Sequence, residues 1–141
     1  MNYYSELLNL SLKANKINCV PVSAIVVKND KIISKAYNRR DITNNILDHA
    51  EIIAINKATK KLKTWNLSDC DLYVSMKPCK MCEAIINESR IKKVYYILDN
   101  EEYDIRKNNE LKKINYYVLE DKDNCYLKIL KDFFKKLRKK R

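Results

Sequence analysis

The 141-residue chain contains no glycine and only two prolines. A protein of this length would normally carry about ten glycines, because glycine makes up ~7% of average sequences. Turns that need a positive φ angle must therefore use asparagine, the next most tolerant residue. We expect such turns at Asn29-Asp30, Asn44-Asn45 and Asn108-Asn109.

The sequence also lacks long apolar runs, and none approaches the ~18 residues that a membrane-spanning helix requires. Residues 1–6 have neither the basic region nor the apolar region of a secretory signal. The five cysteines are an odd number, which in such a chain favours free thiols or metal ligands over a disulfide framework. These features predict a cytoplasmic protein with no membrane partner.

Negative charge is scarce relative to positive charge. The chain has 29 Lys and Arg against 18 Asp and Glu, which gives a net charge of +11. This excess favours an anionic partner, such as nucleic acid, an anionic metabolite or acidic lipid. A composition with 46% hydrophobic and 33% charged residues is typical of a globular chain, and the length suits a single domain over residues 1–141.

Hydrophobic periodicity along the chain predicts an α/β fold. Residues 38–48 are expected to form an irregular loop that lines a site, and residues 99–112 are polar with little periodicity. The order of the elements indicates a three-layer α/β/α sandwich with a mixed five-stranded sheet, whose first two strands form a hairpin. The patterns predict helices at 3–17, 49–62, 79–89 and 123–138, and strands at 22–27, 31–37, 71–76, 93–98 and 114–119.

Three side chains have the spacing of a metal site. Cys79 and Cys82 stand three residues apart, on one face of a predicted helix, and His49 is the only histidine of the chain. One imidazole and two thiolates favour Zn²⁺ over Mg²⁺ or Ca²⁺. Three protein ligands leave a fourth position for water, which is the arrangement of a catalytic zinc site. We therefore predict one Zn²⁺ per chain.

Glu51 is the predicted proton carrier beside this metal. Zinc lowers the pKa of bound water towards ~7 and so provides hydroxide at neutral pH. A nearby carboxylate can take a proton from that water and return it to the substrate nitrogen and the leaving amine. Residues two apart on a helix project about 200° apart. His49 must therefore lie in the cap or first turn if His49 and Glu51 both face the metal.

A structural zinc site would need a fourth protein ligand, and the other cysteines are the candidates. Cys19, Cys70 and Cys125 each lie in or beside an apolar stretch, where a cysteine is more simply a small buried residue. A catalytically silent, zinc-stabilised RNA-binding module remains an alternative on these grounds.

Residues 49–51 (His-Ala-Glu) and 78–82 (Pro-Cys-Lys-Met-Cys) match the HxE…PCxxC signature of zinc-dependent nucleobase deaminases. The flanking segments 20–27, 36–39 and 72–79 resemble those of bacterial tRNA-specific adenosine deaminases. This resemblance implies a cytidine-deaminase-like fold, conversion of the wobble adenosine of a tRNA anticodon to inosine, and a homodimer. It also implies that Asn38 contacts the target base. The chain departs from the family pattern at several places: Ser23 replaces a usual glycine, Lys77 replaces a usual glutamate, and Glu83-Ala84 stands where a small residue and glycine are common. Leu47-Asp48 also precede His49 where small or hydroxyl residues are common, and residues 99–112 lack the family's glycine-containing segment.

The C-terminal segment, a basic helix over about 123–141, supports a polyanionic partner. Residues 128–141 hold eight basic residues and one acidic residue, a charge that phosphate contacts would use. Phe134 lies off the apolar stripe of this helix and is available either for core packing or for stacking on an RNA base. The stripe that docks the helix comprises Tyr126, Ile129, Leu130, Phe133 and Leu137.

An enzyme with the same zinc site that deaminates a free cytosine- or guanine-type base, nucleoside or nucleotide remains a second possibility.

Overall fold

The structure, a computed structural model, describes residues 2–99 and 114–139. No helix within these ranges is both long enough and apolar enough to cross a membrane. The expected Asn108-Asn109 turn and most of the polar segment 99–112 lie outside the described residues.

In chain order the elements are α1 (Tyr3–Lys16), β1 (Ser23–Lys28), β2 (Lys31–Tyr37), α2 (Arg40–Thr43), α3 (Ala50–Leu62), β3 (Asp71–Met76), α4 (Lys80–Glu88), β4 (Lys93–Leu98), β5 (Asn115–Val118), the 3₁₀ turn η3 (Lys122–Asn124) and α5 (Cys125–Lys139).

The five strands form one mixed sheet in the order β2-β1-β3-β4-β5. Strand β1 runs antiparallel to both β2 and β3. Strands β3, β4 and β5 are mutually parallel. The predicted hairpin of the first two strands and the mixed five-stranded sheet are therefore confirmed.

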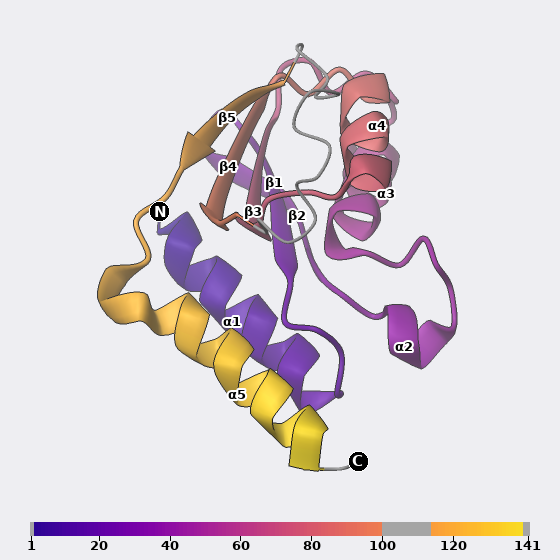
Figure 1. The fold of residues 1–141 in the computed structure, drawn as a ribbon. Helices are drawn as coiled ribbons and strands as arrows, with labels where there is room; N and C mark the ends of the chain where they lie inside the picture. Colours follow the sequence, from indigo (N-terminus) through magenta and orange to yellow (C-terminus); the bar gives the residue numbers. More distant parts are fainter. Residues whose placement is uncertain (1, 100–113, 140–141) are drawn as a thin grey trace.

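Helices cover both faces of this sheet, as the three-layer prediction required. Helices α1 and α5 lie side by side on one face, while α3 and α4 lie on the other (Figure 1). Alternate residues of β1 serve the two layers, because successive side chains of a strand point to opposite faces. Ala24 and Val26 join the core under α3 and α4, and Ile25 and Val27 join the core under α1 and α5.

Asparagine takes several of the positive-φ positions, as expected of a chain without glycine. Asn29 and Asp30 have φ angles of 50° and 60° and form the two-residue turn between β1 and β2. Positive φ at both central residues is the geometry of a type I′ hairpin turn. The expectation was incomplete, because Lys63 (φ 56°) and Arg90 (φ 72°) also take this conformation. At the end of α3, the N–H groups of Lys63 and Thr64 both bond to the Thr59 carbonyl and stabilise that turn.

The predicted irregular loop 38–48 contains one short helix, α2, and this corrects the prediction. The carbonyl of Arg39 accepts hydrogen bonds from the N–H groups of Ile42 and Thr43, and Asn44 ends the turn with a φ of 53°. The N–H of Arg39 donates to the carbonyl of Asp48 (3.1 Å), which joins the two ends of the loop. The sequence pattern gave no signal for this single turn, because none of its residues is buried and it therefore has no apolar period.

Tyr126 attaches α5 to the sheet through a buried hydrogen-bond chain. Its hydroxyl donates to the carbonyl of Pro21 (2.8 Å) and accepts from the Ser75 hydroxyl (3.0 Å). The Ser75 hydroxyl in turn accepts from the N–H of Ser23 (2.9 Å). The Tyr126 side chain is fully buried, so these polar groups depend on one another rather than on water.

We expect Tyr126→Phe to lower the free energy of unfolding by about 1–3 kcal/mol, because it leaves a buried carbonyl and a buried hydroxyl without their partner. Urea denaturation followed by circular dichroism measures the change. Tyr117→Phe is the matched control, since Tyr117 is 42% exposed and surface changes usually stay within about 0.5 kcal/mol. Equal stabilities of the two variants would contradict this role for the Tyr126 hydroxyl.

Candidate metal centre and active site

His49 is the N-cap residue of α3, with extended backbone angles of −72° and 148°. Its side chain therefore leaves the helix at its beginning rather than from its flank. Glu51 lies in the first turn and is only 4% exposed. The expected position of His49 in the cap or first turn is confirmed, and it resolves the problem of two residues that would diverge in mid-helix.

The two thiols occupy the equivalent position on α4. Cys79 is the N-cap residue of that helix and Cys82 lies in its first turn. Neither His49 nor Cys79 uses its side chain to cap its own helix. Helix N-termini carry partial positive charge from their unpaired N–H groups, which stabilises thiolates nearby.

The three ligand atoms lie close enough for one ion. The Nδ1 atom of His49 is 3.5 Å from the sulfur of Cys82 and 3.9 Å from the sulfur of Cys79. All three atoms lie within 4.8 Å of one another. Ligands about 2.0–2.3 Å from a common tetrahedral ion stand roughly 3.5–4 Å apart, so the group fits a metal of zinc's size and ligand preference.

No fourth cysteine joins this group among the residues that the structure describes. Cys19 and Cys70 are buried elsewhere in the core, and Cys125 lies at the start of α5. Within the described ranges, the arrangement is therefore that of an open three-ligand site rather than a closed structural one.

Burial and hydrogen bonding shift the proton affinities of the group. Burial raises the pKa of Glu51, and the neighbouring Cys79 sulfur raises it further. The hydrogen bonds from Cys82 and His49 lower the pKa of Cys79 to about 4. The same interaction with Cys79 raises the pKa values of Cys82 and His49. Metal ligation requires both thiols as thiolates, so metal uptake at this group would release the Cys82 proton.

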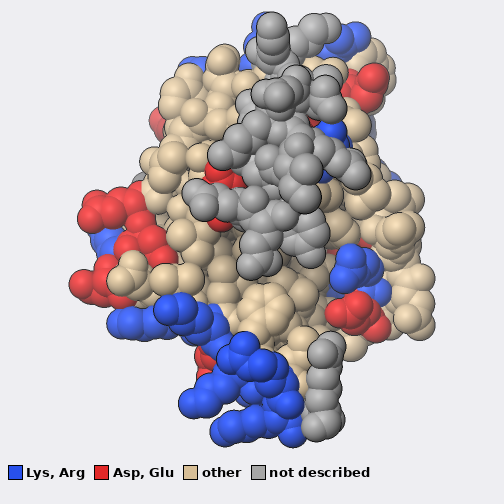
Figure 2. Space-filling view, in the orientation of Figure 1, with Lys and Arg blue, Asp and Glu red and all other residues tan. Residues whose placement is uncertain are grey.

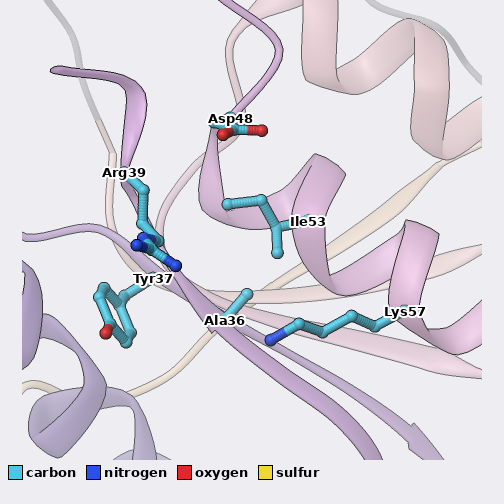
Figure 3. Close-up of a pocket in the computed structure, with 6 residues that line it drawn as sticks. All are labelled: Ala36, Tyr37, Arg39, Asp48, Ile53 and Lys57. Carbon is cyan, nitrogen blue, oxygen red and sulfur yellow. The ribbon is translucent and has the colours of Figure 1, made fainter. Parts of the chain in front are cut away.

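A cavity of about 210 Å³ opens between β2, the two ends of the 38–48 loop and one face of α3. Neither Glu51 nor any of the three metal ligands is among its lining residues. The cationic ends of Arg39 and Lys57 point towards the space above Ala36 (Figure 3). The lining residues are Ala36, Tyr37, Arg39, Asp48, Ile53 and Lys57.

Sequence reasoning placed Arg39 in a site-lining loop but overlooked Lys57. The usable signal was the four-residue spacing of Ile53 and Lys57, which puts both side chains on one helix face. The sequence does not show that this face packs beside β2. There the Lys57 ammonium donates to the carbonyl of Lys35 (3.1 Å).

Asn38 lies at the end of β2 and is buried. Its side-chain oxygen accepts from the N–H of Arg40 (3.0 Å), and its side-chain nitrogen donates to the carbonyl of Val20 (3.3 Å). These bonds hold the start of the 38–48 loop against the segment that enters β1. Contact between Asn38 and a substrate base stays a prediction.

Helix α5 presents most of its basic side chains to solvent. Tyr126, Leu130 and Phe133 are buried as the stripe predicted, and Ile129 is half-buried. The prediction is wrong for Leu137, which is 42% exposed near the end of the helix. Phe134, predicted to lie off the stripe, is also 42% exposed. Lys and Arg side chains gather over the C-terminal half of α5 in Figure 2. The exposed basic residues of the described helix are Lys128, Lys131, Lys135, Lys136, Arg138 and Lys139.

Known proteins that are similar to this chain are deaminases. The family model of MafB19-like deaminases matches residues 1–138. A tRNA-specific adenosine deaminase of Rickettsia bellii is 41% identical over 131 residues, which cover 86% of this chain and 90% of that protein. One from Aquifex aeolicus is 38% identical, covering 84% of this chain and 83% of that protein.

Solved structures extend the comparison to the fold. A structure from a study of A-to-I editing by tRNA:A34 deaminases is similar with a TM-score of 0.79 and 28% identity, covering 91% of this chain and 99% of that one. A guanine deaminase of Nitrosomonas europaea shares the fold with a TM-score of 0.77 at 21% identity, covering 92% of this chain and 81% of that one. With the His/Cys/Cys group at the starts of two helices, these matches establish the family: the chain belongs to the MafB19-like deaminases, alongside the tRNA-specific adenosine deaminases.

Proposed function

We propose that this protein is a zinc-dependent tRNA adenosine deaminase that converts the wobble adenosine of an anticodon to inosine. The observation that carries the proposal is the assembly of His49, Cys79 and Cys82 beside the buried Glu51, in a chain 41% identical to a protein named as that enzyme. Net positive charge and the basic surface of α5 support an RNA substrate over a free nucleoside.

His49, Cys79 and Cys82 would hold the zinc ion, one per chain. When bound, zinc supplies Lewis-acid activation of the water used in hydrolysis. The reaction consumes one water and releases ammonia from C6 of the adenine ring. Glu51 takes a proton from that water, delivers it to the ring nitrogen, and passes a further proton to the leaving amine. Burial raises the pKa of Glu51, and this direction suits a carboxyl group that must both accept and return protons.

The loop after β2 and the neighbouring cavity would receive the RNA. We propose that Asn38 contacts the target base, using hydrogen-bonding capacity beyond its two backbone bonds. Arg39 and Lys57 line the cavity between β2, the 38–48 loop and α3, and supply two positive charges for a backbone phosphate. An anticodon loop presents its bases already single-stranded, which lowers the cost of bringing one to the metal.

We expect Glu51→Gln to lower the rate of inosine formation by roughly 10²–10⁴-fold, because it removes the proton carrier. Zinc content should remain at one per chain. Inosine in an anticodon stem-loop is measured by sequencing or mass spectrometry, and zinc by elemental analysis. Glu88→Gln, at the exposed end of α4, is the matched control, and His49→Ala should lose the metal itself.

Other outcomes of this experiment would replace the proposal. A retained rate in Glu51→Gln would assign the proton transfer to another group. Ammonia release from free bases, nucleosides or nucleotides, with tRNA inert, would identify a deaminase of small substrates. Failure to release ammonia from any substrate would favour the non-catalytic RNA-binding module.

Removal of residues 135–141 should weaken tRNA binding and flatten its dependence on salt concentration. Each lost phosphate contact reduces the slope of log K against log[salt] by about 0.9 on duplex and about 0.7 on single-stranded nucleic acid. The double variant Lys135→Gln/Lys139→Gln tests the charge with the helix intact. Lys60→Gln/Lys61→Gln, two exposed lysines of α3, is the control. Equal slopes for the two variants would leave the α5 charge a solubilising surface.

We also propose a homodimer, located in the cytoplasm. The segment around α2 supports an interface, because Ile42, Ile46 and Leu47 are 52%, 69% and 48% exposed, and grouped exposed apolar side chains mark association surfaces. Sedimentation velocity should give a dimer that Ile46→Asp converts to monomer, while Val118→Asp, equally exposed on β5, does not. A wild-type monomer at micromolar concentration would contradict the proposal.

A further inference from the structure

Tyr116 of β5 contacts the chain on both sides of the thiol pair. Its hydroxyl donates to a carboxyl oxygen of Glu83 (2.5 Å), the residue directly after Cys82. The ammonium of Lys77, two residues before Cys79, lies 4.7 Å from the centre of the Tyr116 ring. One aromatic side chain from a distant strand therefore meets both segments that flank the two sulfur ligands.

The contacts around Tyr116 restrict the orientation of its ring. Tyr96 of β4 packs edge-on against it, with ring centres 5.9 Å apart and planes at 76°. Lys77 also lies over the Tyr96 ring, at 5.9 Å from its centre. Edge-to-face rings and a cation over a ring are both directional attractions. The ring is thus held in the orientation that directs its hydroxyl at Glu83.

Glu83 links the Tyr116 side chain to the first turn of α4. It is only 7% exposed, and a buried carboxyl group needs a hydrogen-bond partner. Its own N–H bonds to the carbonyl of Cys79 (2.9 Å) in the first turn of the helix. Successive residues of a helix are offset by about 100°, so Cys82 can face His49 while Glu83 faces β5. A rotation of α4 that moved the Cys82 sulfur would also pull Glu83 away from Tyr116.

We propose that Tyr116 is a positioning residue for the metal ligands: by bonding Glu83, with Lys77 and Tyr96 holding its ring, it sets the rotation of α4 and thereby the placement of the Cys79 and Cys82 sulfurs relative to His49. The inference rests on the metal site of the proposed function.

The experiment measures metal affinity directly. Tyr116→Phe should weaken zinc binding by about 10–100-fold in competition with a chelator, the usual loss when a residue supporting a metal ligand is removed. The cobalt-substituted protein should show altered thiolate-to-metal absorption bands, because the Co–S geometry changes. Tyr117→Phe, one residue along the strand and 42% exposed, should match the wild type in both measurements.

Glu83 provides the second test. Glu83→Gln keeps an acceptor for the Tyr116 hydroxyl and should retain most of the zinc affinity, whereas Glu83→Ala should lose as much as Tyr116→Phe. The double variant Tyr116→Phe/Glu83→Ala should lose little more than either single change, because both remove one interaction. Thermal melts of the metal-free variants identify any that fail to fold, and the glutamine variant then carries the comparison.

The outcomes separate this inference from the proposed function. Wild-type zinc affinity and cobalt spectra in Tyr116→Phe, even with a lowered melting temperature, would make the contact a stabilising one only and overturn the inference. Strong zinc binding by the wild type without deamination would contradict the proposed function, but the positioning role of Tyr116 could still be tested by zinc affinity. A wild type that binds no zinc would overturn both.

Discussion

The beginnings of two helices meet at one place beside the sheet, and the chemistry of the protein depends on that meeting. The strand β3 ends at Met76, and the N–H of Lys77 bonds to the carbonyl of Leu98 at the end of the parallel strand β4 (2.8 Å). This bond aligns the ends of the two strands, so Cys79 begins α4 just beyond the sheet. His49 begins α3 at the same site, with its Nδ1 atom 3.5 Å from the Cys82 sulfur. Two positive helix ends therefore face the place where thiolates and an attacking water need stabilisation.

The burial of Glu51 is the second condition on this site. A carboxylate in a low-dielectric interior is costly, and burial therefore raises the pKa of the Glu51 carboxyl group. The nearby thiolate acts in the same direction and the His49 imidazole in the opposite one. The result is a carboxyl group whose proton affinity lies above that of a carboxyl in water, beside the open position of a metal group. Burying a carboxyl group lowers the stability of the fold, so core packing does not account for Glu51, whereas a role in the site does.

The surroundings of the site combine rigid and exposed parts. On one side, α4 is held to β5 through Glu83 and Tyr116, and α5 is held to β1 and β3 through the buried Tyr126 hydroxyl. On the other side, the 38–48 loop exposes apolar and cationic side chains, and its ends are joined by the Arg39–Asp48 backbone bond. A fixed metal group next to an accessible loop suits an enzyme that must bind a large polyanion while keeping its reacting atoms in place.

Local spacing in the sequence located most of the elements, and together with the deaminase signature it predicted the metal ligands. The alternation of apolar residues located the strands, and the order of elements indicated the three layers. The two-residue spacing of His49 and Glu51 predicted a helix start, because mid-helix geometry would separate them. The missing glycine predicted asparagine turns, and Asn29 and Asn44 took them. The short helix α2 escaped this reasoning, because a single exposed turn has no apolar period.

By itself, then, the sequence determined two local pairs, Cys79 with Cys82 and His49 with Glu51, since each pair follows from residue type and from spacing within one helix turn. The resemblance to the deaminase signature implied that the two pairs belong to one metal site. Only the tertiary structure decided what surrounds them. Tyr116 reaches Glu83 because β5 lies next to β4 in the sheet. Lys57 lines the cavity because α3 packs beside β2, and Asn38 is buried because the chain entering β1 passes over it. Contacts between residues far apart in the chain depend on strand order and helix packing, for which a single sequence carries no local signal.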